Sequence, residues 1–574
     1  MKKKNNQVGG MALFNGLLLK SKYRECVVKE GNDITIEEYT PDEKFSIRKL
    51  PIIRGLLNII NIITSSIPHI IKSTEEILND MNDDDDEEVK ASSKMIVTIY
   101  IVVMMLLLLM YIFVPNLISL LFPSYLQNIV SASLQLIFFI IYLLILKNYK
   151  ELNTMFEYHG AEHKVVNAYE NFKTSSLSVE DVKKSSRFHR RCGGNFVVYL
   201  VLYIIILTIF IPSTNIWLKS LIQILALPIL IGLACETLTI FSLLPKKLAF
   251  LSYPAMAIQL VTTIEPSEDK IKLAILALKG CVLENKKLTL KEYINKYVKE
   301  NLDKIEYDIS DILRIIAHYK NTTKDNLYIN LDTISVNLKD QIVIESLLNK
   351  LYKENIPLQY ITNTQFFYNE EYFVNENVLI PRQDTEILVE KAIWYITNEN
   401  LTTLIDMCTG SGCVGISIAK NTDIKIAFLV DISKKALDVA EKNIKLNDVF
   451  NKVKTIHSDL FNVFLDKAEN TYDIIVSNPP YIPTNDILSL DENVKKEPFI
   501  ALNGGKDGMD VYRKIFTQAK KVLKNNGLLL LEIGYDELAK ITELIKNDDN
   551  YILVESVKDL GGNDRVVVCR FLQK

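Results

Sequence analysis

The chain has 574 residues, a net charge of −4 and a mean hydropathy of +0.12, so it is too long for one compact domain and averages a globular part with a membrane part. Residues 281–574 carry 37 Lys/Arg and 44 Asp/Glu, a net −7, and residues 1–280 carry 29 and 26, a net +3. Neither half has the strongly basic balance of a general DNA-binding protein.

The first patterned segment, residues 48–72, is apolar on one side and basic at both ends. This pattern fits an amphipathic helix at a membrane surface, and equally well an ordinary packed helix. Four apolar stretches follow, at 95–122, 129–146, 196–211 and 217–244, and we expect them to be transmembrane helices.

The charges between these stretches predict an orientation. The linkers inside each pair carry no Lys or Arg, whereas residues 147–195, between the pairs, carry nine. Basic loops stay in the cytoplasm, so we expect a multi-pass membrane protein with its C-terminal half in the cytoplasm. Glu236 lies inside the fourth span, where a carboxylate is costly and indicates a function.

A histidine motif lies in the basic segment. His159, Glu162 and His163 form an H-x-x-E-H string, which places both imidazoles one helical turn apart on one face. The motif predicts a divalent metal site, for zinc, although such a pair is often only packed or hydrogen-bonded. His189 and Cys192 become further candidate ligands if the chain folds back.

The pattern changes near residue 288 to amphipathic helices, which predict a small helical domain over 285–360. From residue 365 to 574, seven β-rich segments alternate with helical patterns. Such alternation predicts a parallel sheet with helices on both faces.

Four motifs follow β-rich segments, at the edge where parallel sheets bind ligands. Gly410, Gly412 and Gly415 follow the first, in a turn where backbone can approach a ligand closely. Asp431 ends the second and is placed to accept ribose hydroxyls, or to cap the next helix. Asp459 follows the third and is a candidate acceptor for an adenine amino group. Asn478–Tyr481 follow the fourth.

The sequence Asn478-Pro479-Pro480-Tyr481 suits transfer of a methyl group to a planar amino group. The Asn478 side-chain carbonyl and the Pro479 backbone carbonyl can accept both N–H hydrogens, and two prolines stiffen the turn. Tyr481 offers a face to a planar group. Catalysis then rests mostly on orientation, and adenine, cytosine and glutamine all remain open as acceptors.

Residues 285–574 resemble the protein-(glutamine-N5) methyltransferases that modify peptide-chain release factors. The resemblance rests on IPLQYIT (356–362), VLIPRQDTE (378–386), DMCTGSG (406–412), SNPPYIP (477–483), EPFIALNGGKDGMDVYRKI (497–515) and DLGGNDRVVV (559–568). It implies a Rossmann-like class I domain with a seven-stranded, mostly parallel sheet, using S-adenosyl-L-methionine.

The resemblance also implies a substrate and a set of site residues. The substrate is the glutamine of the Gly-Gly-Gln motif of class I release factors, held by Asn478 to Tyr481 and approached by the helical domain. The cofactor positions are Cys408, Thr409, Gly410, Ser411, Gly412, Asp431, Leu460 and Asn478. The family usually has Gly in place of Cys408 and commonly Trp in place of Leu460, so the adenine pocket loses a stacking face.

Residues 1–280 resemble the YqhQ-like family of uncharacterised membrane proteins, described as predicted metal-dependent enzymes. The shared stretches are GGMALFNG (9–16), YHGAEHKVVNAYE (158–170), HRRCGGNF (189–196) and PAMAIQLVTTIEPSEDKIKLAI (254–275). Two other functions remain open: an adenine-N6 or other nucleic-acid methyltransferase, and a metal-binding membrane scaffold with a passenger methyltransferase. The acidic balance of the second half disfavours stable nucleic-acid binding.

Overall fold

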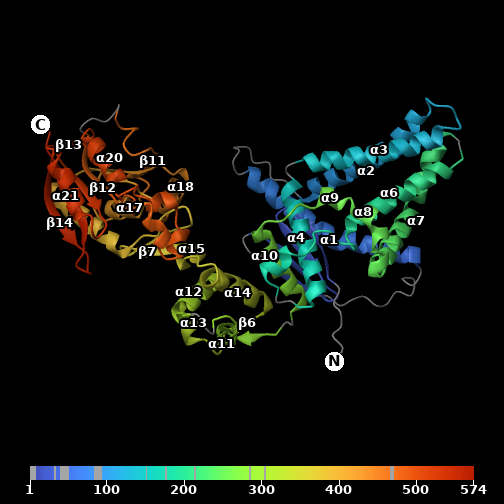
Figure 1. The fold of residues 1–574 in the computed structure, drawn as a ribbon, viewed down its shortest axis with the longest axis horizontal. Coiled ribbons are helices and arrows are strands. Elements are labelled where there is room, and N and C mark those ends of the chain that lie inside the picture. The colour runs from blue at the N-terminus through green and yellow to red at the C-terminus, as the bar shows by residue number, and fades with distance from the viewer. Residues whose placement is uncertain are drawn as a thin grey trace. The chain divides into compact units, whose positions relative to one another are not determined.

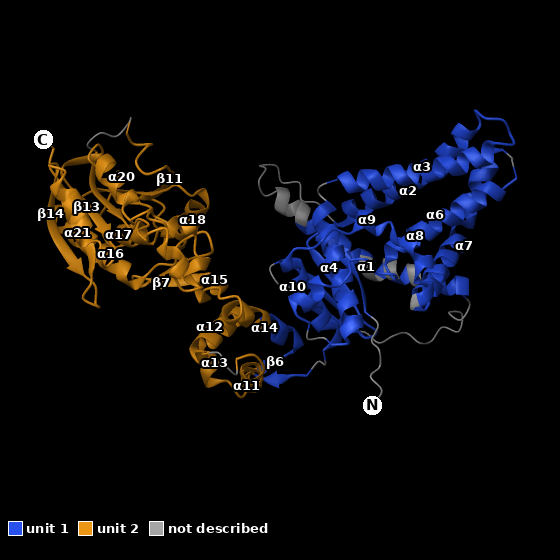
Figure 2. Ribbon diagram, in the orientation of Figure 1, with its two compact units in different colours: residues 1–289, 335–343 blue, residues 290–334, 344–574 orange. Residues whose placement is uncertain are grey.

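A computed structural model describes residues 8–30, 34–38, 51–82, 93–149, 152–174, 177–212, 215–283, 286–302, 306–465 and 471–573. The chain runs from the N-terminal helices to a C-terminal α/β region (Figure 1). It forms two compact units, residues 1–289 with 335–343 and residues 290–334 with 344–574 (Figure 2). The domain boundaries at 280, 285, 360 and 365 stay predictions.

The first unit begins with a sheet that the sequence did not predict. Strands β1 (Gly9–Leu13), β2 (Gly16–Lys20), β3 (Arg24–Lys29) and β4 (Ile34–Glu38) form an antiparallel meander. Helices α4 (Asn153–Phe172) and α10 (Glu268–Val282) pack on it. Residues 17–19 form an apolar run that is buried in this sheet. These residues therefore do not show the spacing of apolar residues that indicates a helix.

Among the described residues of this unit, four helices are long and apolar enough to cross a membrane, as the sequence predicts. They are α2 (Ser93–Ser119), α3 (Gln127–Asn148), α6 (Gly193–Phe210) and α7 (Ile216–Leu243). Hydrogen bonds between buried polar side chains join them: Asn116 of α2 donates to Gln223 of α7 at 2.7 Å and accepts from Ser131 of α3 at 2.6 Å. Lipid tails are as apolar as the helix surfaces, so apolar burial alone does not favour one helix as a partner over another. Polar contacts of this kind then hold the helices together.

The amphipathic segment forms, from residue 51 on, part of helix α1 (Pro51–Asn82), which packs against α7. Gly55 and Gly232 allow the close approach, because a Cβ on Gly55 would lie 2.7 Å from the Gly232 carbonyl oxygen. Arg54 then reaches Glu236, with Nε–Oε1 and Nη2–Oε2 distances of 3.1 and 2.6 Å. The carboxylate in the fourth span is therefore paired with a cation of α1, and a function for Glu236 stays a prediction.

Smaller elements connect these helices. They are α5 (Val179–Lys183), the 3-10 helix η4 (Lys246–Ser252), α8 (Tyr253–Met256), α9 (Gln259–Thr262) and a two-residue strand pair, β5 (Leu288–Thr289) with β6 (Ser335–Val336).

The second unit begins with helices, as the amphipathic patterns predict. They are α11 (Leu290–Asn301), α12 (Ile309–Lys320), α13 (Lys324–Ile329), the part of α14 (Leu338–Tyr352) after residue 343, and α15 (Leu358–Thr362). A hairpin of β7 (Thr364–Phe367) and β8 (Glu370–Phe373) and the 3-10 helix η5 (Gln383–Thr385) lead into the α/β region.

The α/β region is a seven-stranded sheet in the order β11-β10-β9-β12-β13-β15-β14, in which only β15 runs antiparallel to its neighbours. The order reverses beside β9, so the loops after β9 and β12 diverge and leave a crevice at the carboxyl edge. The strands are β9 (Thr403–Met407), β10 (Ile426–Asp431), β11 (Val453–His457), β12 (Tyr472–Ser477), β13 (Leu523–Glu532), β14 (Tyr551–Lys558) and β15 (Asp564–Phe571).

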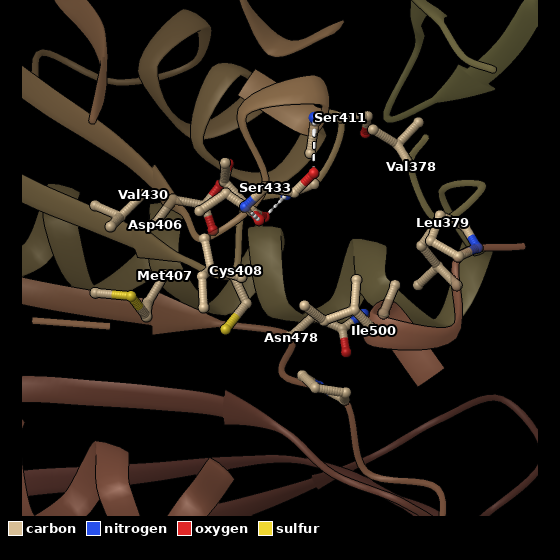
Figure 3. Close-up of a pocket in the computed structure, with 18 of the residues that line it drawn as sticks. Val378, Leu379, Asp406, Met407, Cys408, Ser411, Val430, Ser433, Asn478 and Ile500 are labelled. Atoms are coloured by element: carbon tan, nitrogen blue, oxygen red, sulfur yellow. Dashed lines mark hydrogen bonds between the residues drawn. The ribbon is translucent and has the colours of Figure 1, made fainter. Parts of the chain in front are cut away.

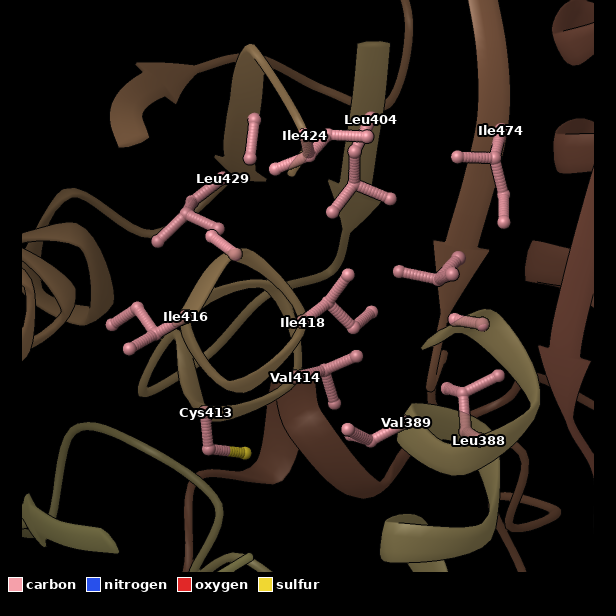
Figure 4. Packing of buried hydrophobic residues seen from close by; sticks show 14 of the residues in the cluster. Leu388, Val389, Leu404, Cys413, Val414, Ile416, Ile418, Ile424, Leu429 and Ile474 are labelled. Carbon is pink, nitrogen blue, oxygen red and sulfur yellow. The ribbon is translucent and has the colours of Figure 1, made fainter. Parts of the chain in front are cut away.

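Alternating apolar residues bury both faces of this sheet. Leu404 and Ile474 face α16 (Glu386–Glu399), α17 (Cys413–Lys420) and α18 (Lys434–Leu446), as part of the cluster in Figure 4. Their neighbours Ile405 and Ile475 face α20 (Asp510–Ala519) and α21 (Leu538–Lys546). The predicted α/β fold, with helices on both faces of a mostly parallel sheet, is therefore confirmed.

Candidate functional site

A cavity of about 290 Å³ opens at the carboxyl edge of β9, β10 and β12. All four strand-end motifs contribute to its wall (Figure 3). Val378 and Leu379 line the side opposite Asp406 and Cys408. The predicted cofactor residues that line it are Cys408, Thr409, Gly410, Ser411, Asp431, Asp459, Leu460 and Asn478. Gly412 is absent from the lining and begins α17 as its N-cap.

The loop after β9 is shaped by Asp406, which sequence reasoning did not single out. Its Oδ2 accepts hydrogen bonds from Thr409 Oγ1 at 2.6 Å and from Gly415 N at 2.9 Å. Burial raises the pKa of this carboxyl to about 7. Gly410 has φ +55°, and a Cβ there would meet nothing within 4 Å. This open space beside the loop leaves room for a nucleoside-containing cofactor to approach the backbone.

Two departures from the family pattern lie where the backbone is left-handed. Cys408 has φ 60° and Leu460 has φ 46°, a region in which L-residues are strained. This explains why glycine suits position 408. Leu460 is buried and presents aliphatic surface to the cavity, so a bound adenine would meet methyl groups and not a ring.

Asp431 lies at the end of β10 with both carboxylate oxygens engaged. Oδ2 accepts from Gly410 N at 2.9 Å and Oδ1 accepts from Ser433 N at 2.8 Å. The N-cap of α18 is Ser433, so the alternative role of Asp431 as the helix cap is wrong. Each oxygen keeps a second lone pair for a ribose hydroxyl. Asp459 lies exposed at the rim.

The Asn478–Tyr481 turn lies between two cavities. Asn478 and Pro480 line the first, whereas Tyr481 lines a second, more open cavity of about 630 Å³. Pro381 and Arg382 line both. Burial raises the pKa of the Tyr481 phenol to about 12, so the ring is neutral. A group entering the second cavity therefore meets this turn before it reaches the first.

Two stretches quoted only for family likeness build the walls of the site: residues 378–386 line both cavities, and residues 497–515 line the first. Glu497, whose side chain is 1% exposed, is hydrogen-bonded to the Arg382 guanidinium and accepts from Ile380 N at 3.0 Å. This brace ties residues 378–386 to residues 497–515. The sequence offered no signal that pairs Arg382 with Glu497, because both stretches contain several charged residues.

A second polar group lies in the first unit. The ligand atoms of His159, His163 and Cys192 all lie within 4.8 Å of one another. His159 Nδ1 donates to the Thr262 carbonyl at 2.7 Å and His163 Nδ1 donates to the Arg187 carbonyl at 2.6 Å. Because a carbonyl only accepts, each neutral ring keeps its lone pair on Nε2, and His159 Nε2 lies 3.3 Å from Cys192 Sγ. This is the arrangement seen in metal-ligating histidines.

This group differs from the predicted one at one position. Glu162 lines the same cavity, of about 240 Å³, but accepts a hydrogen bond from the Gly10 backbone and is not among the three converging residues. Cys192 is the third converging residue in place of Glu162, because the chain folds back at the start of α6. His189 lies nearby, its ring centroid 5.7 Å from that of His163.

The strand order, the crevice beside β9 and the glycine loop with its acidic strand ends define an S-adenosylmethionine-dependent methyltransferase of class I. Residues 384–494 match the family model described as "Methyltransferase small domain". The release factor glutamine methyltransferase of Thermodesulfovibrio yellowstonii is 37% identical over 274 residues, which are 47% of this chain and 95% of that protein. The chain therefore belongs to the release factor glutamine methyltransferase family.

Other similarities cover parts of the chain. The release factor glutamine methyltransferase of Clostridium acetobutylicum is 42% identical over 217 residues, 38% of this chain and 75% of that protein. A solved protein-(glutamine-N5) methyltransferase from Alicyclobacillus acidocaldarius is 27% identical with a TM-score of 0.23, covering 35% of this chain and all of that one. Residues 50–284 match the family described as "Protein of unknown function (DUF1385)". The enzyme is thus fused to a region of unknown role.

Proposed function

We propose that the second unit methylates the side-chain amide nitrogen of the glutamine in the Gly-Gly-Gln motif of class I release factors. The observation that carries this proposal is the position of Asn478–Tyr481 between the two cavities. The relatives named for release factor glutamine methylation support the choice of acceptor. The net charge of −7 on residues 281–574 supports it against a nucleic-acid acceptor.

The residues divide the work in a simple way. Bound S-adenosylmethionine would supply an electrophilic methyl group, and residues 408–411, Asp431, Asp459 and Leu460 would hold it in the first cavity. Asn478 Oδ1 and the Pro479 carbonyl accept the two N–H hydrogens of the glutamine amide, while Tyr481 contacts its planar face. These contacts orient the nitrogen, whose lone pair is otherwise delocalised. Transfer of the methyl group would break its C–S bond and form a C–N bond, and the nitrogen would release one of its two protons to solvent.

The test uses the full chain in detergent with methyl-labelled S-adenosylmethionine. We expect label in a class I release factor, and none in a variant of that factor whose motif glutamine is replaced by alanine. An adenine-containing DNA duplex is the third substrate. Label in DNA and not in the release factor would overturn the proposal and favour a nucleic-acid methyltransferase.

We also propose that the chain is a multi-pass membrane protein whose second unit faces the cytoplasm. Large apolar side chains cover the outside of α2, where Met104 and Met105 are 64% and 68% exposed. The basic segment between the span pairs supports this orientation. Protease added to sealed, right-side-out vesicles should leave the second unit intact, and its digestion there would contradict the orientation.

We further propose that the first unit binds one zinc ion through His159, His163 and Cys192. Two imidazoles and a thiolate suit zinc, and the backbone carbonyls already fix both ring orientations. Metal analysis of the full chain should give about one zinc per chain. Cys192→Ala should lose it, and Cys281→Ala, at another buried cysteine, should keep it. Zinc retained by Cys192→Ala would refute this ligand set.

A further inference from the structure

The amide of Asn478 has two orientations of nearly identical shape, and only one of them suits the reaction. Its oxygen must face the incoming glutamine nitrogen, because that nitrogen donates both of its hydrogens. In the flipped orientation an NH₂ group would face the substrate, and two donors would meet. The site therefore needs a feature that selects one orientation.

The structure places acceptors on the NH₂ side of this amide. Asn478 Nδ2 donates to Thr385 Oγ1 at 3.2 Å, across 93 residues of sequence. The buried carboxyl of Glu532, at the end of β13, lies close enough to Thr385 and Asn478 for these two polar side chains to lower its pKa against the effect of burial. Thr385 and Glu532 are 2% and 1% exposed. The NH₂ group of Asn478 thus donates to Thr385 with the Glu532 carboxyl nearby, and its oxygen is left for another group.

Glu532 is suited to this selection because a carboxylate accepts hydrogen bonds and cannot donate them. Its Oε2 atom is buried without a hydrogen-bond partner among the described residues. No described donor is bonded to this atom, so it can accept from the nearby Asn478 amide. A bond between a charged acceptor and an amide donor is also stronger than a neutral one.

We propose that Glu532, together with Thr385, is a positioning residue that fixes the Asn478 amide with its oxygen toward the glutamine to be methylated. This inference rests on the proposed glutamine methyltransferase activity. Glu532 touches neither the acceptor nor the cofactor in this account. It acts through Asn478, and Thr385 passes its own hydroxyl hydrogen to the Glu532 carboxyl while accepting from Asn478.

The protonation state of Glu532 gives a readout that a purely structural role would lack. Burial raises the pKa of its carboxyl to about 7. Below that pH the protonated carboxyl can donate, and the preference for one Asn478 orientation is lost. Activity should therefore rise with pH through about 7. The titratable and charged groups facing Glu532 are Asp384, Cys413, Tyr481, Tyr512 and Arg565.

The experiment compares full-length variants in detergent. Glu532→Leu removes the acceptor and should lower kcat about 10- to 100-fold, the range of one charge-assisted hydrogen bond. Glu532→Gln keeps an acceptor without the charge, so it should lower kcat less and flatten the pH profile near 7. Thr385→Val should lower kcat and Thr385→Ser should restore it. Glu555→Leu, in the neighbouring strand region and away from both cavities, is the matched control.

Two binding measurements separate positioning from damage to the site. S-adenosylmethionine affinity should be unchanged in Glu532→Leu, whereas affinity for a Gly-Gly-Gln peptide, measured without cofactor, should fall. Wild-type kcat in Glu532→Leu would overturn the inference, as would a lower kcat with equal loss of cofactor affinity. If the wild-type chain itself fails to methylate a release factor, the proposed function fails first.

Discussion

The brace between residues 378–386 and 497–515 predicts a measurable loss when Glu497 is removed. In Glu497→Ala the N–H of Ile380, a residue only 2% exposed, loses its acceptor. The residues next to Ile380 line the first cavity, so the same change should raise KM for S-adenosylmethionine. One substitution then tests both the packing and the architecture of the site.

The magnitude follows from three contributions. An unsatisfied buried N–H costs about 1–3 kcal/mol. The contact with Arg382, whose side chain is 43% exposed, adds less than about 1 kcal/mol because water screens it. Burial raises the pKa of Glu497, so loss of the buried carboxylate offsets part of the cost. The net loss in the free energy of unfolding is about 2 kcal/mol, which lowers Tm by roughly 4–8 °C for a unit of this size.

Fluorescence gives a local assay, because the chain has two tryptophans, Trp217 in α7 and Trp394 in α16. In a Trp217→Phe background, thermal unfolding followed by fluorescence reports on the second unit alone. Glu492→Ala, at an exposed carboxylate paired with Lys495, should leave Tm unchanged. Equal Tm values for the Glu497 and Glu492 variants, with an unchanged KM, would refute the brace.

Three further changes have distinct expected outcomes. Gly410→Ala places a methyl group in open space at φ +55°, so calorimetry should show weaker S-adenosylmethionine binding with only about 1 kcal/mol of strain; unchanged affinity would contradict the loop's role. Burial raises the pKa of Asp406 from 3.8 to about 7, so the contribution of this carboxyl to stability falls as pH rises from about 4 to 7. Asp406→Asn should therefore make Tm less sensitive to pH in that window. Parallel plots of Tm against pH for the wild type and the variant would refute this. Gly160→Ala puts a Cβ 2.1 Å from the Ile264 carbonyl oxygen, close to the Thr262 carbonyl that orients His159. Zinc affinity, measured by competition with a chelator, should therefore fall about 10-fold, as it does when a contact that orients a ligand is lost. Unchanged zinc affinity would exclude a role for the Thr262 carbonyl in orienting His159.

Several features of this protein follow from the sequence because they depend on neighbouring residues. Alternating apolar residues such as Leu404 and Ile405 face opposite sides of a strand, so the strands and the two-sided burial of the sheet are predictable. Motifs at the ends of parallel strands meet at one edge, so Cys408, Asp431 and Asn478 were expected to share a cavity, and they do. The long apolar stretches likewise required only length and composition.

Other features depend on segments that meet only after folding. Cys192 joins His159 and His163 because the start of α6 packs near α4, and the H-x-x-E-H pattern instead indicated Glu162. The sheet at 9–38 went unpredicted, because its short buried strands lack a period that distinguishes them from other apolar runs.

The sequence thus determined that a methyl donor and a planar amide could be brought together at Asn478, but not how that side chain is oriented. Thr385, Asn478 and Glu532 lie on three segments that are distant in the chain, and no local pattern in the sequence links the three residues. Asn478 and Glu532 come together because the sheet register sets the end of β13 beside the end of β12. The spacing of apolar residues reflects local backbone geometry, so it can be read from neighbouring residues. Which distant side chains meet depends on how segments pack together, and only the tertiary structure decides that.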